Sequence, residues 1–595
     1  MTGVWAGSLA AQDSAPSTEV AQAEELLSRG MTEQATSILA AHLRSQPSDV
    51  RARLLLAEVF LKLGRTDSAE EQYQAALTRA PDNYIALAQL GSLYESEGKL
   101  DKAEPVLARA VKHSSGEPQL RVEWAAVLAR LHRFHEASRA LSGVLAPVSV
   151  EDRMTFFRLK AAVASGEGNA SAAASDMESA LAIGPRDARL EMATAAAEAS
   201  AHNWKRAAGL ASPLFAAAND PAAGLLLVEA QLEMNEDVRS TLASLHDCKL
   251  SSERAGEFHE RLAKLLISHA HFADATEDLE QALELDPQNA DLMFDLALAE
   301  FKAGQAKEAL DTAQKCRSLR DGAEVEDLLG DIAESAGDNL SAVRSYQAAV
   351  TLAPEDENYR ISLAVELLRH ENFEPAKVVL TQAESLFPKS WRIVAALGMV
   401  QYFAGTKESS SRILLRASEL APQSQTVFEY LGEVEMDESS PPDGAAIARL
   451  CGFADAHSDA AREEFYCGAL QLHRDYVARD TTHAAEIVRR LTLSAKALAR
   501  EAGPHCELGR AEAWLERWQP ALHESEVCAQ LDPDSAKAHY RLAQLYHRMG
   551  QTDHWREQLE LHRVAALRLA DENEQRQKTR NTFIYKIRTQ APEGP

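Results

Sequence analysis

Side chains that could carry out catalysis are few and scattered along this 595-residue chain. No glycine-rich phosphate-binding motif, no GxSxG nucleophile motif and no HExxH zinc motif occurs in the sequence. His523 and Glu524 begin like a zinc motif, but Val527 stands where the second histidine would be. Because a single imidazole rarely forms a metal site, the histidines are expected to be core or surface residues. The sequence therefore predicts no catalytic residue, no metal site and no cofactor.

One region leaves an enzymatic alternative open. Residues 438–502 keep a helical periodicity but lose the regular spacing found elsewhere in the chain. His473, Asp475 and His483 are residue types in this region that could form a catalytic site. An activity that survives their replacement would count against this alternative.

The six cysteines show no CxxC or zinc-finger spacing, so a disulfide framework is not needed to hold the fold. They are Cys248, Cys316, Cys451, Cys467, Cys506 and Cys528. Cys506 and Cys528 fall on the two expected helices of one repeat, where a bridge is conceivable. Buried free thiols are favoured, because cysteine is a common small core residue.

The chain is strongly acidic, with a formal net charge of -28 from 62 basic and 90 acidic residues. Such a surface repels phosphate backbones, which argues against nucleic acid as a partner. The acidic surface can serve solubility alone, which is the favoured interpretation, or it can include a site for basic segments.

Neither a membrane-spanning segment nor a complete signal peptide is evident. The longest apolar candidate, residues 393–405, contains Gln401 and falls short of the roughly 18 residues that span a bilayer. At the N-terminus, Ala10 and Ala11 resemble the end of a secretory signal, but no basic region or full apolar region precedes them. A truncated signal of an exported, periplasmic protein is favoured slightly over an ordinary disordered tail.

A repeat of 34 residues organises most of the chain. Its cleanest copy, residues 323–354, reads AEVEDLLGDIAESAGDNLSAVRSYQAAVTLAP. Small residues recur where two helices would approach closely, larger apolar residues fill the gaps, and a proline ends the unit. The copy shows these offsets at Leu329, Gly330, Gly337, Ala342, Tyr346, Ala349 and Pro354.

The pattern resembles the tetratricopeptide repeat family, whose unit is a helix-turn-helix stacked into a solenoid. The small residue that this family has at its eighth position is present as Ala57, Gly91, Ala263, Ala297, Gly330, Ala364, Gly398, Gly432, Gly509 and Ala543. The closing proline is present as Pro47, Pro81, Pro185, Pro287, Pro354, Pro388, Pro422 and Pro533. The resemblance implies an all-α, right-handed superhelical solenoid of about fifteen or sixteen stacked antiparallel helix pairs.

Breaks in the repeat divide the chain into expected parts. A disordered tail or signal remnant covers 1–15, an N-terminal array 16–245, and a more regular central array 256–437. Irregular helical hairpins are expected over 438–502, further repeat units over 503–570, and a capping helix with a tail over 571–595.

The resemblance also implies a concave groove lined by the first helix of each unit. Carried onto this sequence, its inward positions in one unit are Glu324, Asp327, Asp331 and Glu334, a fully acidic stripe suited to a basic peptide or helix. The next two units present Asn358, Ile361, Val365 and Leu368, then Arg392, Ala395, Met399 and Tyr402. This acidic stripe beside an apolar patch predicts a protein-docking surface, the alternative being an ordinary solvated helix face. Asparagine is largely absent from the sixth position, which speaks against a carboxylate clamp of the chaperone type and against the asparagine ladder of the sugar-transferase members.

The C-terminal tail mixes apolar and basic residues. Phe583, Ile584, Tyr585 and Ile587 alternate with Lys586 and Arg588. Such a segment could bind a partner or a membrane surface. Packing on the final helical hairpin, or disorder, is the favoured expectation.

A non-catalytic scaffold that binds partner proteins or peptides is the function that the resemblance implies. If the N-terminal segment is a signal remnant, the scaffold would serve bacterial envelope assembly or polysaccharide export. The alternatives are a cytoplasmic adaptor or regulator and, less favoured, an enzyme with its site in 438–502.

Overall fold

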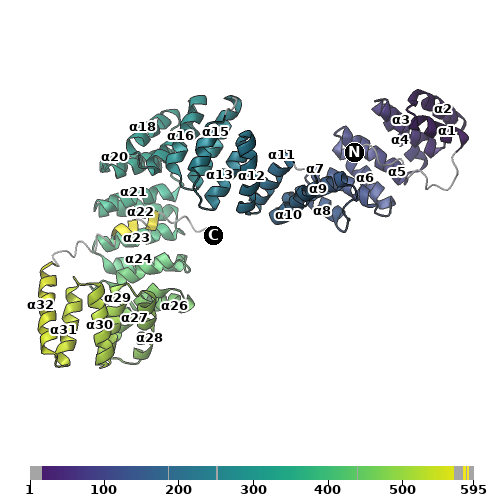
Figure 1. Cartoon of the computed structure of the whole chain (residues 1–595). Helices are drawn as coiled ribbons and strands as arrows, with labels where there is room; N and C mark the ends of the chain where they lie inside the picture. The colour runs from purple at the N-terminus through teal and green to yellow at the C-terminus, as the bar shows by residue number, and fades with distance from the viewer. Residues whose placement is uncertain are drawn as a thin grey trace. The chain divides into compact units, whose positions relative to one another are not determined.

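A computed structural model describes residues 17–184, 187–248, 252–438, 440–457, 459–568, 580–584 and 586–588. Within these ranges the chain is helical and contains no strand (Figure 1). Two compact units divide at Arg254 and Ala255. The expected tail at 1–15, and most of the expected cap and tail at 571–595, lie outside the described residues.

The first unit contains seven pairs of antiparallel helices. They are α1 (Thr18–Ser28), α2 (Thr32–Ser45), α3 (Val50–Lys62), α4 (Thr66–Arg79), α5 (Tyr84–Ser96), α6 (Leu100–His113), α7 (Pro118–Arg130), α8 (Phe134–Leu141), α9 (Val150–Gly166), α10 (Ala170–Ile183), α11 (Ala188–Ser200), α12 (Trp204–Ala218), α13 (Pro221–Glu233) and α14 (Arg239–His246).

The second unit continues with nine pairs and contains the residues of interest below. Its helices are α15 (Ser252–Ser268), α16 (Phe272–Leu285), α17 (Ala290–Lys302), α18 (Ala306–Leu319), α19 (Ala323–Ser335), α20 (Asn339–Leu352), α21 (Glu357–Arg369), α22 (Phe373–Leu386), α23 (Trp391–Phe403), α24 (Lys407–Leu420), α25 (Gln425–Met436), α26 (Gly444–Ala456), α27 (Ala461–Ala478), α28 (Ala484–Ala497), α29 (Ala502–Trp514), α30 (Trp518–Leu531), α31 (Ala536–Arg548) and α32 (Thr552–Arg568). Each helix packs mainly on its sequence neighbours, as expected for a solenoid. The predicted all-α architecture of stacked helix pairs is confirmed.

Local sequence explains where the helices begin and turn. Ser390 starts α23 by accepting a hydrogen bond from the Ile393 backbone N–H at 3.3 Å, as an N-cap residue does. Gly337 and Gly405 follow the first helices α19 and α23 of two regular pairs, with φ of 75° and 83°. Only glycine adopts this left-handed backbone without a steric cost, so the helix ends there and the chain reverses.

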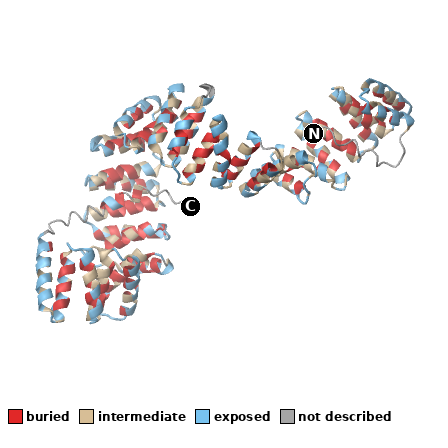
Figure 2. Cartoon of the chain, viewed as in Figure 1, coloured by how far each residue is buried: buried red, intermediate tan, exposed pale blue. Residues whose placement is uncertain are grey.

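The first helix of a pair is buried on more sides than the second. All ten residues from Trp391 to Val400 in α23 are buried, whereas α24 buries only a stripe. Figure 2 shows the same contrast between buried and exposed helix faces along the second unit. The first helix α23 is sandwiched between neighbouring pairs, which explains its nearly continuous apolar sequence.

A close helix approach positions one tyrosine that matters below. A Cβ atom at Gly330 would lie 2.5 Å from the Tyr346 ring, so only glycine allows Tyr346 of α20 to pack against α19. The Tyr346 ring is fully buried by this contact, and its hydroxyl group reaches the opposite edge of α19.

The expectation of free thiols is wrong for four of the cysteines. Cys451 of α26 and Cys467 of α27 form one disulfide, and Cys506 of α29 and Cys528 of α30 form a second. Cys248 and Cys316 are free. Sixteen and 22 residues separate the paired cysteines, so each pair falls on adjoining antiparallel helices where the two sulfur atoms can meet.

Among the described helices, none combines the length and the apolar character that crossing a bilayer requires.

Candidate partner-binding surface

Four first helices of consecutive pairs, α19, α21, α23 and α25, pack side by side in the second unit. Their side chains form one continuous surface, which we call the α19–α25 surface. The helical residues 580–584 and 586–588, here called the C-terminal segment, lie on it (Figure 1). The chain thus supplies a ligand to its own helical array.

Three apolar side chains anchor the C-terminal segment. Phe583, Ile584 and Ile587 lie on one face of the segment, and each is at most 5% exposed. They belong to the same apolar cluster as the core of α21, α23 and α25. The Phe583 ring meets the Tyr430 ring edge-on at 5.1 Å between centroids and lies 6.2 Å from the Phe403 ring. Aromatic pairs favour this edge-to-face geometry, so the contact is specific as well as apolar.

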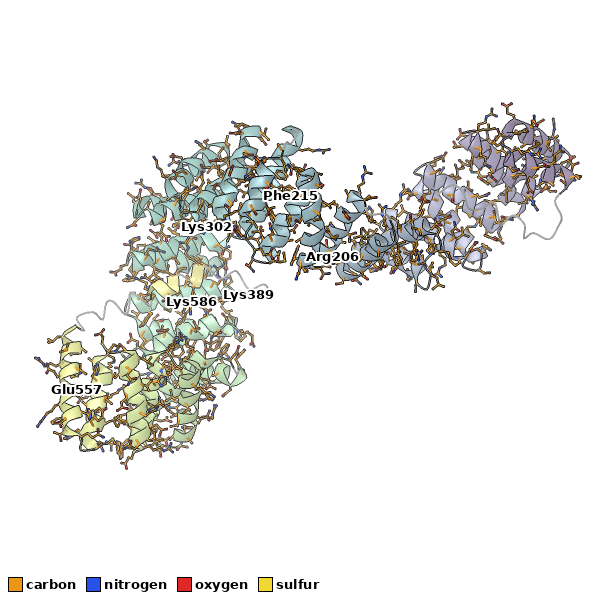
Figure 3. All side chains as sticks on the ribbon, viewed as in Figure 1. Arg206, Phe215, Lys302, Lys389, Glu557 and Lys586 are labelled. Atoms are coloured by element: carbon orange, nitrogen blue, oxygen red, sulfur yellow. A yellow bond between two sulfur atoms is a disulfide. The ribbon has the colours of Figure 1, made fainter. Side chains whose placement is uncertain are left out.

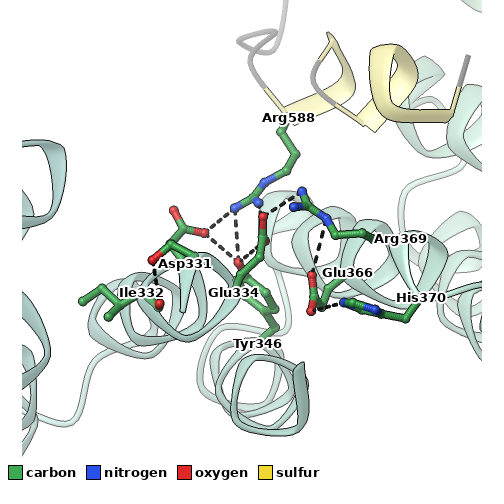
Figure 4. A network of polar contacts seen from close by, with 9 residues as sticks. Asp331, Ile332, Glu334, Tyr346, Glu366, Arg369, His370 and Arg588 are labelled. Atoms are coloured by element: carbon green, nitrogen blue, oxygen red, sulfur yellow. Dashed lines mark hydrogen bonds and ion pairs between the residues drawn. The ribbon is translucent and has the colours of Figure 1, made fainter. Parts of the chain in front are cut away.

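The acidic stripe of α19 receives the last described residue of the segment. Arg588 pairs with Asp331 and donates from Nη1 to Glu334 Oε2 at 2.8 Å (Figure 4). The Tyr346 hydroxyl group lies 2.7 Å from Asp331 Oδ1 and 3.0 Å from Glu334 Oε2, and it accepts from Arg588 Nη2 at 3.3 Å. Arg369 of α21 completes the network by pairing with Glu334 at 2.7 Å. A guanidinium between two carboxylates is the arrangement that makes charge-assisted hydrogen bonds strong.

Two more basic residues of the segment pair with acidic residues of the array. Arg580 Nη1 lies 2.9 Å from Glu371 Oε1, and Lys586 contacts the Glu429 carboxylate. Figure 3 labels Lys586 on the segment. Together with Arg588, these residues match each described basic side chain of the segment to a carboxylate of the α19–α25 region.

The backbone of the segment is also recognised. Arg392 of α23 donates from Nη2 to the carbonyl oxygen of Ile587 at 3.1 Å. Its other terminal nitrogen donates to Asn358 Oδ1 at 2.7 Å, which fixes the guanidinium. A cation at a helix C-terminus satisfies free carbonyl groups and complements the helix dipole.

Glu371 is held in an unusual backbone conformation. It ends α21 at the position where Gly337 and Gly405 end α19 and α23, and it has φ of 60°. A left-handed backbone costs a residue with a side chain on the order of 1 kcal/mol. The residue that occupies this strained turn is the one that pairs with Arg580. The same left-handed conformation follows other first helices at His132, His202 and Ala270, so the conformation by itself does not mark a function.

The four predicted acidic residues have different surroundings. Asp331 and Glu334 contact Arg588, whereas Glu324 accepts a hydrogen bond from Arg320 at 2.8 Å and lies at the edge of the stripe. Burial raises the pKa of Asp327 to about 6, and the nearby Asp331 carboxylate acts in the same direction. An ionised Asp327 would therefore be stabilised by a cation brought to this end of the surface.

The predicted apolar residues form the floor below the segment. Ile361, Val365 and Met399 are buried in the cluster that includes Phe583, Ile584 and Ile587. Arg392 binds the segment backbone, as described above. The Tyr402 hydroxyl group donates to Asp437 Oδ2 at 3.1 Å, and it is the adjacent Phe403 that meets Phe583.

Five contact residues escaped prediction from the sequence. Tyr346 comes from a second helix, Glu371 from a turn, and Phe403 from the end of a first helix. Glu429 and Tyr430 both lie on α25. Glu429 occupies the inward fifth position of the unit whose eighth residue is Gly432, so the repeat register could have identified it, whereas Tyr430 occupies the sixth position. The repeat register identifies only four positions of the first helix. The sequence gives no distinguishing signal for Glu371, because non-glycine residues occupy the same turn position in several other pairs.

The expectation for the C-terminal tail is wrong. Its described residues contact α19, α21, α23 and α25. An apolar cluster with room for Phe583 and Ile587, and acidic partners for the basic residues, lies about 200 residues earlier in the sequence. The segment therefore packs on these distant helices, although the final hairpin is nearer in the sequence.

The region that kept an enzymatic alternative open shows an ion-pair network. Asp475 is buried and accepts from Arg474 Nε at 2.8 Å, while its second oxygen lies 3.1 Å from His483 Nδ1. In the described part of the chain, no group of three or more His, Cys, Asp or Glu residues is arranged to hold a metal ion. The network joins α27 to the start of α28.

The fold and the surface together define a class: a solenoid of helix pairs that holds a short amphipathic helix on successive first helices. Family models described as tetratricopeptide repeat match residues 20–83 and 57–118, residues 266–332 and residues 536–561. These matches confirm that the chain contains tetratricopeptide repeats, as the repeat offsets predicted.

Several solved structures resemble the chain at low identity. A structure of Naa15/Naa10 bound to HypK-THB matches with 12% identity and a TM-score of 0.29, over 96% of this chain and 99% of that one. The Cut9-Hcn1 hetero-tetramer of the APC/C matches with 15% identity and a TM-score of 0.30, over 84% and 98%. The pilF protein of Pseudomonas aeruginosa matches with 20% identity and a TM-score of 0.29, over 36% and 96%. No curated protein sequence matches the chain.

Proposed function

We propose that this protein is a non-catalytic interaction scaffold that binds partner proteins through the α19–α25 surface. The observation that carries the proposal is the C-terminal segment itself. The surface holds a helical segment by burying three apolar side chains and by pairing each described basic residue with a carboxylate. A surface with an apolar centre and charged edges has the anatomy of a peptide-binding site.

The proposed partner is a protein with a basic segment, not a nucleic acid. The net charge of -28 opposes binding to phosphate backbones. The acidic side chains of α19 and α25 attract Lys and Arg at close range, so partner binding should weaken as salt is added.

We further propose that the scaffold works in an oxidising, exported compartment, in bacterial envelope assembly or polysaccharide export. The two disulfides support the compartment, since such bonds persist outside the reducing cytoplasm. The identities of bound proteins would decide between the two pathways. Reduced cysteines in the native protein, together with cytoplasmic partners, would instead indicate an adaptor in the cytoplasm.

Affinity capture from native cells with matched variants tests the scaffold proposal. D331K/E334K reverses the charge of the site, whereas D311K/E419K makes the same change at exposed positions on the second helices α18 and α24. A partner set that is retained by D311K/E419K and lost by D331K/E334K would support the proposal. Equal capture by both variants, with melting temperatures close to that of the unaltered protein, would show that partners bind elsewhere.

A further inference from the structure

The C-terminal segment occupies the surface that the proposed function assigns to partners. We infer that the C-terminal segment is a built-in competitor, and that the partner segment is an amphipathic helix with the same contact pattern, which must displace it. This inference rests on the proposed function. It adds the chemistry of the partner and the way in which access to the surface is regulated.

The contacts define what a partner helix must present. The pattern begins with a basic residue at the place of Arg580, then an aromatic residue three positions later and an aliphatic residue directly after it. A second aliphatic residue follows at the place of Ile587, and arginine follows at once to meet the two carboxylates of α19. These positions recur at helical spacing, so a single helix face carries the apolar contacts.

The segment leaves room for a better ligand. The Tyr430 hydroxyl group, in a residue only 4% exposed, has no hydrogen-bond partner among the described residues, and neither does the buried Oδ1 of Asp327. Phe583 covers Tyr430 but offers no polar atom to it. Each buried polar atom left unpaired weakens binding by roughly five- to a hundredfold. A partner that supplies a polar atom beside Tyr430, or a second cation beside Asp327, would therefore bind more tightly than the segment.

The outer contacts of the segment are open to exchange. The Glu371 side chain is 65% exposed where it meets Arg580, and the Lys586 side chain is 36% exposed. The other partners, Arg580 and Glu429, are 10% and 14% exposed. Because one side of each ion pair stays in water, salt screens these pairs more than the apolar contacts, and they can break first as a partner arrives. Phe583 and Ile587 then determine how firmly the segment stays in place.

The expected strength of the competition follows from tethering. A ligand joined to its site through a short linker has an effective concentration on the order of millimolar. If the free segment binds with a dissociation constant near 10 μM, the tethered copy lowers the apparent affinity for a competitor by about a hundredfold.

Fluorescence anisotropy with a labelled synthetic peptide of residues 580–588 tests the inference on the full chain. The unaltered protein is compared with F583D/I587D, which removes two apolar anchors, and with R588E, which reverses the charge of the ionic anchor without altering the array. Asn581→Ala, at an exposed position of the segment, is the matched control. We expect the peptide to bind F583D/I587D about a hundredfold more tightly than it binds the unaltered protein. Its affinity for R588E should lie between these two values, and its affinity for N581A should equal that for the unaltered protein.

The outcomes separate the inference from the proposed function. Equal affinity for the unaltered protein and for both released variants would overturn the competition while leaving the surface a peptide-binding site. No binding to released variants that keep their helical circular dichroism would overturn the recognition surface itself. If the unaltered protein binds the peptide more weakly as its own concentration is raised, the segment binds a second copy of the chain. That result would overturn competition within one chain.

Discussion

Phe583 should control whether the C-terminal segment stays on the α19–α25 surface. Its ring is 1% exposed and packs against Tyr430 and Phe403. Replacing it by alanine removes most of the buried apolar surface at the centre of the contact. It leaves the salt bridges of Arg580 and Arg588 in place.

The size of the effect follows from the burial. Phenylalanine-to-alanine changes in well-packed cores cost about 3–5 kcal/mol. Since 1.4 kcal/mol is a factor of ten, the equilibrium constant for detachment should rise by about 150-fold to a few thousandfold. A segment that is detached in about 1% of molecules would then be detached in most of them. The helix pairs themselves pack on their neighbours, so the melting temperature of the protein should change little by comparison.

Limited trypsin digestion measures this population, because Arg580, Lys586 and Arg588 are cleavage sites in the segment. When opening is fast compared with cleavage, the cleavage rate follows the open population. F583A should therefore be cut in the segment about 60- to 100-fold faster than the unaltered protein, while N581A should be cut at the same rate. A rise of less than about threefold for F583A would refute the reasoning that burial of Phe583 holds the segment.

Three further changes test other features of the second unit. Glu371→Gly should raise the melting temperature, because glycine adopts the left-handed turn without the cost of about 1 kcal/mol that a side chain adds. The same change should speed trypsin cleavage of the segment, because Arg580 loses its carboxylate partner. A lower melting temperature would argue against strain at Glu371. Asp327→Asn should stabilise the protein by roughly 3 kcal/mol at pH 8 and far less at pH 4, because a pKa raised from 3.8 to about 6 makes the ionised form costly above that range. An effect on stability that does not depend on pH would contradict this origin. Reduction of the disulfide between Cys506 and Cys528 should lower the free energy of unfolding by about 3 kcal/mol, because this disulfide closes a loop of 22 residues. Alkylation of either cysteine in denaturant without reductant would show that the bond is absent from the native protein.

The fold could be predicted because its determinants are local. Each helix pair carries its own small residue, turn glycine and closing proline, so every unit gives the same signal again. The acidic stripe was visible for the same reason, since Asp331 and Glu334 lie within one helix. Stacking then follows from the pattern without any contact between distant parts of the sequence.

The occupant of the surface could not be predicted in this way. Arg588 and Asp331 are 257 residues apart, and nothing near either residue marks the other as its partner. Tyr346 reaches the site from a second helix only because Gly330 permits a close approach, which the repeat register explains as core packing. The prediction of free thiols was wrong for four cysteines for a related reason. A buried cysteine and a bonded cysteine have the same local sequence, and only the register of adjoining helices brings the sulfur atoms together.

The long separation between the segment and its surface has a consequence for synthesis on the ribosome. A helical array folds from its first units onward as they emerge, since each unit needs only its neighbours. At roughly 5–20 residues per second, translation takes about 10–30 s to extend the chain by the ~150 residues from the end of α25 to Arg588. Throughout that interval the surface is folded while its internal ligand has yet to be made. A partner that reaches the folded array before residues 580–588 arrive therefore meets an open surface, whereas a later partner must compete with the segment.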